Sequence, residues 1–135
     1  MWVRTLVTRT TIIAIAGASA SGKSLFSQTI YNELVNELEP GAIAIIEEDA
    51  YYKDQSHLPM AHRTQTNYDH PDAFEHALML EHLTQLRSGN SVEVPTYDYA
   101  QHTRSEKTRR VPAAKILIVE GILLLSDKAL NKEFD

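Results

Sequence analysis

Residues 11–24 read Thr-Ile-Ile-Ala-Ile-Ala-Gly-Ala-Ser-Ala-Ser-Gly-Lys-Ser. The stretch 11–16 is apolar and β-rich without alternation, which is typical of a parallel strand buried on both faces, and we expect this strand at the centre of a sheet. The stretch 17–24 matches the pattern G-x-x-x-x-G-K-[ST] of a phosphate-binding loop. A helix is predicted directly after it, because apolar residues recur at near-helical spacing from Lys23 until Pro40-Gly41. The residues of this apolar stripe are Phe26, Ile30, Leu34 and Leu38.

The residue types in the loop each have a physical role in holding phosphate. Gly17 and Gly22 allow main-chain N–H groups to turn inward around phosphate oxygens, and the amino end of the helix adds a positive partial charge. Lys23 reaches the β- and γ-phosphates, and the Ser24 hydroxyl joins the Mg²⁺ shell. The competing interpretation is an ordinary Gly/Ser-rich turn. Such a turn does not require Lys and Ser at these positions between a strand and a helix, so we favour the phosphate loop. The predicted phosphate-binding residues are Gly17, Ala18, Ser19, Ala20, Ser21, Gly22, Lys23 and Ser24.

Strands and helices alternate along the rest of the chain, as expected for one α/β domain with a mostly parallel sheet. The predicted elements are strands over 42–46 and 115–121, a helix from Pro71 to Gly89, a half-exposed strand over 91–94 that pairs with 107–111 beside the main sheet, and a last helix capped by Ser126. Residues 47–70 are polar without clear periodicity. We expect a long loop or a broken helix there, and long loops in compact domains are usually functional.

Acidic residues follow two of the predicted buried strands. In an open parallel sheet, ligands bind beyond the carboxyl ends of the strands, where Gly17, residues 47–49 and Glu120 are expected to meet. A carboxylate directly after a buried strand, as at Glu120, can hold Mg²⁺ together with Ser24. We expect Asp49 to accept the proton of a substrate hydroxyl or to help position the metal. Glu47 and Glu48 are interpreted as solvated or structural acids.

Composition excludes several classes of function. A chain of 135 residues fits one domain, and a formal net charge of −5 excludes a positive field that would hold nucleic acid. Without cysteine the chain has no disulfide, no thiolate nucleophile and no Cys-ligated metal. The six histidines are not spaced as helical metal pairs. The sequence lacks the G-x-S-x-G motif of enzymes that catalyse acyl transfer, so phosphoryl transfer is the better supported chemistry.

Membrane insertion and secretion are not expected. No apolar stretch reaches the ~18–20 residues needed to span a bilayer. Arg4 and Arg9 before an apolar run, followed by Ala18-Ser19-Ala20, imitate a signal peptide. Cleavage there would cut through the phosphate loop, so we interpret this region as a buried strand followed by that loop and not as a signal peptide. Because the absence of cysteine suits a reducing compartment, we expect a cytoplasmic protein.

Two polar clusters rich in aromatic residues, 67–74 and 95–104, predict the site of the phosphate acceptor. Their rings can hold a planar base while their polar tips bind its edge. Tyr97 and Tyr99 share a face if the segment is extended, and His102 is close enough to add a directional hydrogen bond. Tyrosines packed at a sheet margin are the structural alternative.

The motifs, taken together, resemble those of bacterial uridine kinase and the uridine–cytidine kinases of pyrimidine salvage. They are GASASGKS (17–24), EEDAYYKDQSHL (47–58), TNYDHPDAF (66–74), PTYDYAQHTRSEKT (95–108) and ILIVEGILLLSDKAL (116–130). Their order matches that family across nearly all of residues 11–130, which is more specific than the phosphate loop alone. The resemblance implies a P-loop NTPase three-layer sandwich and transfer of the γ-phosphate of ATP or GTP to the 5′-hydroxyl of uridine or cytidine, with Mg²⁺.

Individual roles follow from this resemblance by motif position. Asp49 matches the catalytic acid, beside Lys23, and Glu120 matches the acid next to the metal. The residues that match the nucleoside pocket, besides Asp49, are Tyr52, Tyr68, Asp69, Tyr97, Tyr99 and His102. Among these, Asp69 is expected to hold the ribose hydroxyls, while Tyr97 and His102 contact the pyrimidine edge. The expected partners are small molecules, with a homotetramer for the full-length protein.

Departures from the family pattern are few. Ala50 stands where many members have Ser or Cys, and Arg109-Arg110 replace a less charged hairpin segment. Family chains continue past Asp135 into a lid with arginines and further strands, so we expect a fragment or a shortened chain with an unpaired strand edge and poor turnover. Two alternatives remain open: another P-loop kinase of the phosphoribulokinase or pantothenate kinase type, and a non-catalytic nucleotide-binding or regulatory fragment.

Overall fold

The computed structural model describes residues 10–17 and 22–135 and has a parallel three-stranded sheet at its centre. The strands are β1 (Thr11–Ala16), β2 (Ile43–Glu47) and β5 (Ile116–Gly121), in the order β1-β5-β2. The α/β class with an open, mostly parallel sheet is therefore confirmed. Our placement of 11–16 at the centre was wrong: β5 is central, and β1 lies at an edge of the described sheet. An apolar strand signals that both of its faces are covered, but it does not say how many strands flank it in the plane.

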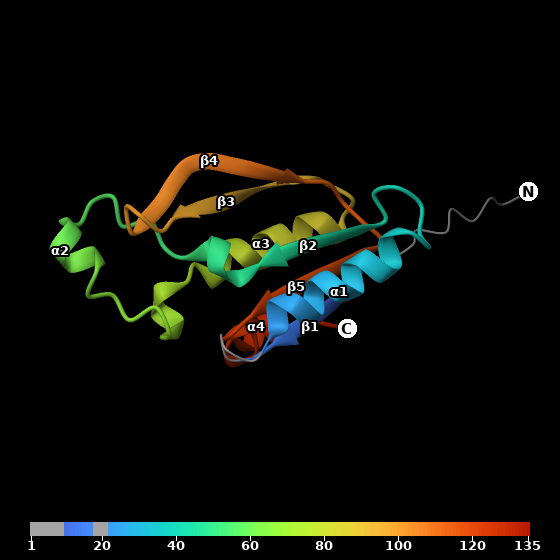
Figure 1. Ribbon diagram of the computed structural model, residues 1–135, viewed down its shortest axis with the longest axis horizontal. Coiled ribbons are helices and arrows are strands. Elements are labelled where there is room, and N and C mark those ends of the chain that lie inside the picture. The colour runs from blue at the N-terminus through green and yellow to red at the C-terminus, as the bar shows by residue number, and fades with distance from the viewer. Residues whose placement is uncertain (1–9, 18–21) are drawn as a thin grey trace, which may run out of the picture.

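Helices cover both faces of the sheet (Figure 1). Helix α1 (Lys23–Val35) lies on one face, and α3 (His76–Arg87) lies on the other. Because side chains alternate along a strand, Ile12, Leu117 and Ile46 share the α3 face. They form one buried core together with Met79, Leu83 and Leu86 of α3. The predicted layers are thus present, and the opposite strand positions face α1.

Helix α1 packs through most of the predicted stripe, but Ser27 takes the inward position that we expected for Phe26. Gly22 enters the helix with φ 79, a left-handed conformation that glycine adopts without steric cost. Ser27 is buried, whereas Phe26 is 58% exposed. The half-buried residues Ile30 and Leu34 continue the Ser27 face. The small Ser27 side chain lets the helix approach the sheet, which rotates Phe26 out of the core, contrary to our expectation.

A β-hairpin lies beside the main sheet, as predicted. Its strands are β3 (Val92–Asp98) and β4 (Thr103–Val111), and their antiparallel register places Val92 opposite Val111. The pairing extends well beyond the predicted residues 91–94 and 107–111. The prediction was too short because the many charged residues of β4 obscure the apolar alternation that is typical of a strand. The register shifts after Pro95, which has no N–H to donate. The Arg109 side chain connects the hairpin to the main sheet, because its Nη2 donates a hydrogen bond to the Ile45 carbonyl at 3.0 Å.

Residues 47–70 form the broken, mostly irregular segment that we expected. They contain a 3₁₀ turn, η2 (Glu48–Tyr51), and the short helix α2 (Met60–Arg63). Pro71 opens only a further 3₁₀ turn, η3 (Pro71–Ala73), and α3 begins later, at His76. The predicted single helix from Pro71 was therefore wrong, because the chain between η3 and α3 is extended: Phe74 forms a β-bridge with Tyr52.

The last helix, α4 (Lys128–Asn131), follows the 3₁₀ turn η4 (Leu124–Ser126). Its cap is Asp127, whose Oδ1 accepts from the N–H groups of Ala129 and Leu130 at 2.9 and 3.1 Å. Our assignment of the cap to Ser126 was wrong by one residue, since both residue types cap helices and only the backbone decides between neighbours. Within residues 10–17 and 22–135, none of the helices has the length and apolar character to cross a membrane.

Candidate functional site

The carboxyl ends of the three parallel strands meet at one edge of the sheet, as the sequence predicted. Gly17 donates its N–H to the Gly121 carbonyl at 3.1 Å, which ties the end of β1 to the end of β5. On the other side of β5, Glu47 is the register neighbour of Glu120. By alternation both carboxylates project to the α1 face of the sheet, the side on which Lys23 begins its helix.

The predicted phosphate loop lies between these strand ends and α1. Gly17 and Gly22 are its described main-chain positions, and the Gly22 carbonyl accepts from the Phe26 N–H at 3.0 Å in the first helical turn. The expectations for Ala18, Ser19, Ala20 and Ser21, and for the side chains of Lys23 and Ser24, lie outside the described residues. What the structure does describe is the setting that such a loop requires: a buried strand on one side and the amino end of a 13-residue helix on the other.

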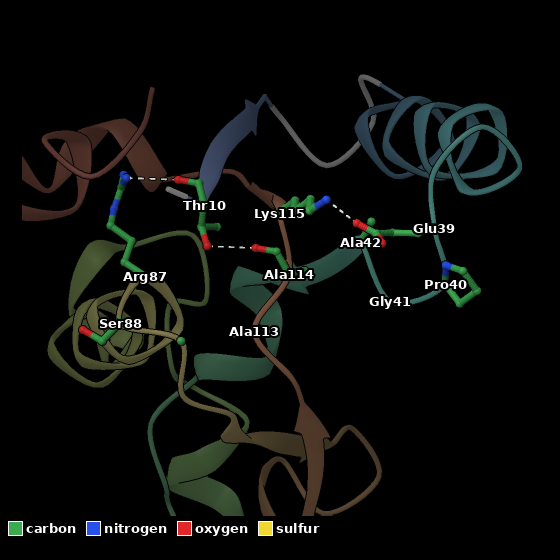
Figure 2. Close-up of a pocket in the computed structure, with 11 residues that line it drawn as sticks. Thr10, Glu39, Pro40, Gly41, Ala42, Arg87, Ser88, Ala113, Ala114 and Lys115 are labelled. Carbon is green, nitrogen blue, oxygen red and sulfur yellow. Dashed lines mark hydrogen bonds and ion pairs between the residues drawn. The ribbon is translucent and has the colours of Figure 1, made fainter. Parts of the chain in front are cut away.

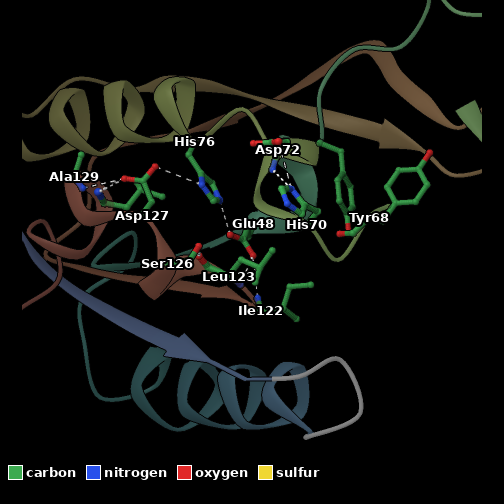
Figure 3. Close-up of polar contacts among 12 residues, drawn as sticks. Glu48, Tyr68, His70, Asp72, His76, Ile122, Leu123, Ser126, Asp127 and Ala129 are labelled. Carbon is green, nitrogen blue, oxygen red and sulfur yellow. Dashed lines mark hydrogen bonds and ion pairs between the residues drawn. The ribbon is translucent and has the colours of Figure 1, made fainter. Parts of the chain in front are cut away.

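Glu48 joins the end of β2 to the end of β5 (Figure 3). Its side chain is completely buried, and Oε1 accepts from the main-chain N–H groups of Ile122 and Leu123 at 2.9 and 3.0 Å. Gly121 allows this close approach, because a Cβ there would lie 2.5 Å from the Cβ of Glu48. Of our two interpretations for this acid, solvated or structural, the structure supports the structural one.

His76 completes the buried group around Glu48. Its Nε2–H donates to Glu48 Oε2 at 2.7 Å, and its Nδ1 lies 3.5 Å from Oδ2 of Asp127, the cap of α4 (Figure 3). The imidazole also stacks on Phe74 at 5.3 Å with nearly parallel rings. Sequence reasoning missed His76, because a single histidine at the start of a helix has no spacing that marks it. We name Glu48, His76 and the Ile122–Leu123 main chain the strand-end clamp.

Asp49 follows the clamp directly, inside η2, and its charge acts on two of the predicted acceptor residues. Burial raises the pKa of Tyr52 above its ordinary value, and the charge of Asp49 raises it further. Burial and the charge of Asp49 likewise raise the pKa of Tyr99. The charge of Asp69 also acts on Tyr52. The structure therefore brings the proposed acid to the edge of the aromatic cluster.

Tyr52, Tyr68 and Tyr97 form the centre of that cluster. The Tyr52 ring lies 5.0 Å from Tyr68 and 5.2 Å from Tyr97, and it stacks on Phe74 at 4.4 Å. At the periphery, Tyr99 contacts Tyr97 at 5.2 Å, and His102 lies 6.5 Å from Tyr68. These five predicted residues come from three segments and are brought together; Asp69 lies exposed on the loop next to Tyr68.

Two cavities flank the cluster. One of about 370 Å³ includes Tyr97, Tyr99 and Glu47 in its wall, so it reaches the end of β2. The other, of about 190 Å³, is bounded by Tyr52, Tyr68 and Gln55. The four predicted tyrosines are thus divided between two cavities, and Asp49, Asp69 and His102 line neither of these two.

A further cavity of about 320 Å³ lies at the opposite, amino ends of the strands (Figure 2). Arg87 and Lys115 contribute its positive charge. Arg87 is paired with Glu133 at 3.2 Å and donates to the Thr10 carbonyl, and Lys115 is paired with Glu39. The carboxylates neutralise both cations, so this cavity offers less to an anionic ligand than the edge near the predicted phosphate loop.

Comparison with known proteins identifies the family and the fold of the chain. Residues 12–135 match the family described as "Phosphoribulokinase / Uridine kinase family". A uridine kinase of Tolumonas auensis is 63% identical over 121 residues, covering 90% of this chain and 56% of that protein, and one of Vibrio atlanticus is 57% identical with similar coverage. The chain therefore spans less than three fifths of the length of these relatives.

A solved structure of a possible uridine kinase from Bacillus stearothermophilus superposes with a TM-score of 0.73, at 19% identity, over 94% of this chain and 68% of that one. D-glycerate 3-kinase from Cryptococcus neoformans superposes with a TM-score of 0.60, at 18% identity, over 86% of this chain and 44% of the other. At these identities the likeness concerns the fold, which is that of the P-loop kinases. With the sequence match over nearly all of its length, the chain belongs to the phosphoribulokinase/uridine kinase family.

Proposed function

We propose that this chain is the N-terminal part of a nucleoside kinase domain that transfers the γ-phosphate of ATP or GTP to the 5′-hydroxyl of uridine or cytidine. In this proposal residues 17–24 bind the phosphates, and residues 49–74 and 95–104 bind the nucleoside. The observation that carries it is the position of Asp49: it follows the strand-end clamp, and its charge acts on the aromatic cluster. A carboxylate in that place can accept the proton of a hydroxyl that attacks a phosphate.

Donor binding rests on the amino end of α1 and on two acids. Main-chain N–H groups at the start of a helix attract phosphate, and Lys23 adds a full positive charge. Carboxylate oxygens fit Mg²⁺, which keeps several waters and uses few protein ligands, so Glu120 and Asp49, with the Ser24 hydroxyl, are a suitable donor set. Among the described residues there is no group of three or more His, Asp or Glu side chains that would suit a metal cage. When bound, Mg²⁺ would neutralise charge that develops on the phosphates.

Acceptor binding rests on the aromatic cluster. Tyr52, Tyr68, Tyr97 and Tyr99 offer ring faces to a planar base, and His102 offers a ring nitrogen to its edge. Asp69 supplies a carboxylate for the ribose hydroxyls. A planar-base site favours a nucleoside over pantothenate or ribulose phosphate, neither of which has an aromatic ring. Family membership also supports the finer proposals that the donor is ATP with Mg²⁺ and that the intact protein is a cytoplasmic homotetramer.

Binding and transfer, measured separately, test the proposal. Calorimetry of the purified 135-residue chain with uridine, cytidine, ATP and CTP is expected to give binding of a pyrimidine nucleoside, and a product assay is expected to give slow transfer. In a panel that includes pantothenate and ribulose phosphate, preferential transfer to either compound contradicts the nucleoside assignment. Nucleotide binding without product, in this chain and in a version extended by the C-terminal region of a relative, supports a non-catalytic fragment instead.

A further inference from the structure

We propose that Gln55 is a positioning residue that holds His102 and the tyrosine hydroxyls in the arrangement that selects the pyrimidine base. The proposal rests on the proposed function, and it adds a residue to which neither the motifs nor the family match assigned a role. Gln55 lies in the irregular segment after η2 and is only 7% exposed.

The side chain of Gln55 connects all the segments of the predicted acceptor site. Its Nε2 donates to the Tyr68 hydroxyl at 2.9 Å and to the His102 carbonyl at 2.9 Å, and it lies 3.4 Å from the Tyr97 hydroxyl. Its Oε1 accepts from the Thr66 hydroxyl. One buried amide therefore links the loop 66–68, the end of β3 and the turn between β3 and β4.

A count of hydrogens shows which of these contacts matter most. A primary amide has two N–H hydrogens, and the two short bonds, to Tyr68 and His102, use both. The Tyr68 hydroxyl donates to the Arg63 carbonyl at 3.0 Å, so in its contact of 2.9 Å with Tyr97 it is the acceptor. Tyr97 keeps the proton that it donates there, because burial and the Tyr68 contact raise its pKa above the ordinary value. Both hydroxyl protons are thus used inside the protein, and the two tyrosines present ring faces to a ligand.

His102 is left as the side chain that supplies a polar contact to the base in this proposal. Its main chain has φ 49, the left-handed region that non-glycine residues adopt rarely. Gln55 stabilises this turn twice: its Nε2 holds the His102 carbonyl, and its main-chain N–H donates to the Thr103 hydroxyl at 2.7 Å. Thr103 in turn donates to Asp54 at 3.0 Å. Within the described residues the ring nitrogens of His102 make no hydrogen bond, so the turn is fixed while the imidazole is available to a ligand.

The test is a double-mutant cycle on nucleoside binding by the 135-residue chain. Gln55→Leu keeps the size of the side chain and removes both donors. We expect uridine to bind about 10-fold more weakly, as for the loss of one or two hydrogen bonds, and MgADP affinity to change less than about 2-fold. In a His102→Asn background, which tolerates the left-handed turn, Gln55→Leu is expected to add less than about 2-fold, because the two residues act as a unit.

The controls separate positioning from general damage. Gln65→Leu makes the same change at an exposed glutamine in the same segment and is expected to leave uridine affinity unchanged. Gln55→Glu keeps the size and the Oε1 acceptor but lacks the donors, so it is expected to weaken uridine binding as Gln55→Leu does. Unchanged uridine affinity in a folded Gln55 variant, or independent effects in the cycle, overturns the proposal.

A readout without ligand keeps this inference separate from the proposed function. If the wild-type chain binds no pyrimidine nucleoside, the proposed function fails, and amide hydrogen exchange then decides the positioning role. Gln55→Leu is expected to speed exchange in the turn 100–104 by about 10-fold relative to the wild type. Equal protection of this turn in the two proteins overturns the role assigned to Gln55.

Discussion

The strand-end clamp and the aromatic cluster are held together by different means. In the clamp, one buried carboxylate accepts from the two main-chain N–H groups that directly follow β5, so the strand ends set the geometry around Asp49 and Glu120. In the aromatic cluster, side chains from the irregular segment 52–68 and from the β3–β4 hairpin are linked through Gln55. The difference indicates that phosphate chemistry depends on strand topology, whereas the choice of acceptor depends on contacts between loops.

The largest expected effect tests the catalytic end of this comparison. In the completed enzyme, Asp49→Asn should lower kcat by about 10²–10⁴-fold, because the amide cannot accept the proton of the attacking hydroxyl. Glu47→Gln, two residues earlier at the end of β2, should have a small effect. Steady-state kinetics with uridine measure both variants. Equal activity of Asp49→Asn and the wild type would remove this residue from the proposed role.

The next effect concerns the stability of the clamp. Glu48→Ala should lower the free energy of unfolding by about 3–5 kcal/mol, because it leaves His76 and two main-chain N–H groups buried without their partner. The exposed neighbour gives a matched control, since Glu47→Ala should cost no more than about 0.5 kcal/mol. Denaturant unfolding followed by circular dichroism measures both. Similar losses in the two variants would mean that the clamp does not stabilise the strand ends.

A smaller effect tests the acceptor end. His102→Asn should raise the KM for uridine by about 10-fold with little change in kcat, because it removes a directional contact with the base and preserves the left-handed turn. His102→Ala should act similarly and weaken the turn as well. Kinetics with uridine and cytidine measure the change. A fall in kcat at constant KM would instead place His102 in the chemical step.

The smallest effect is a pH dependence in the buried region between α3 and η2. Burial lowers the pKa of His82 below its ordinary value of 6.5, and its Nδ1 accepts from the Tyr51 hydroxyl at 2.8 Å. Below pH 6.5 the unfolded chain therefore binds a proton that the folded chain does not, and the free energy of unfolding falls as the pH decreases. His82→Gln should reduce this slope. Denaturant titrations from pH 7 to pH 5 compare the variants, and identical slopes would contradict the assignment.

Prediction from sequence succeeded where a local pattern has one structural solution. The strand 11–16, the helix after Lys23 and the strand 115–121 were correct, because burial on two faces and helical spacing are written into consecutive residues. Prediction failed where the packing of other elements determines the outcome. The examples are the place of β1 in the sheet, the exposure of Phe26 and the residue at which α3 begins. His76 and Gln55 had no signal at all, because some of their partners lie far away in the sequence: Glu48 is 28 residues from His76, and Thr103 is 48 residues from Gln55.

The sequence by itself determined the α/β class, the order of the elements and the loop pattern that points to phosphate chemistry. These follow from local properties of the sequence, namely the periodicity of hydrophobic residues, the residue types that cap helices and the conformational freedom of glycine. Only the tertiary structure decided that Glu48 locks β2 to β5 and that Gln55 links the segments of the acceptor site. Such contacts form between segments that are distant in the sequence. Packing and hydrogen-bond geometry in three dimensions select the partners, and the spacing of residues along the chain does not predict them.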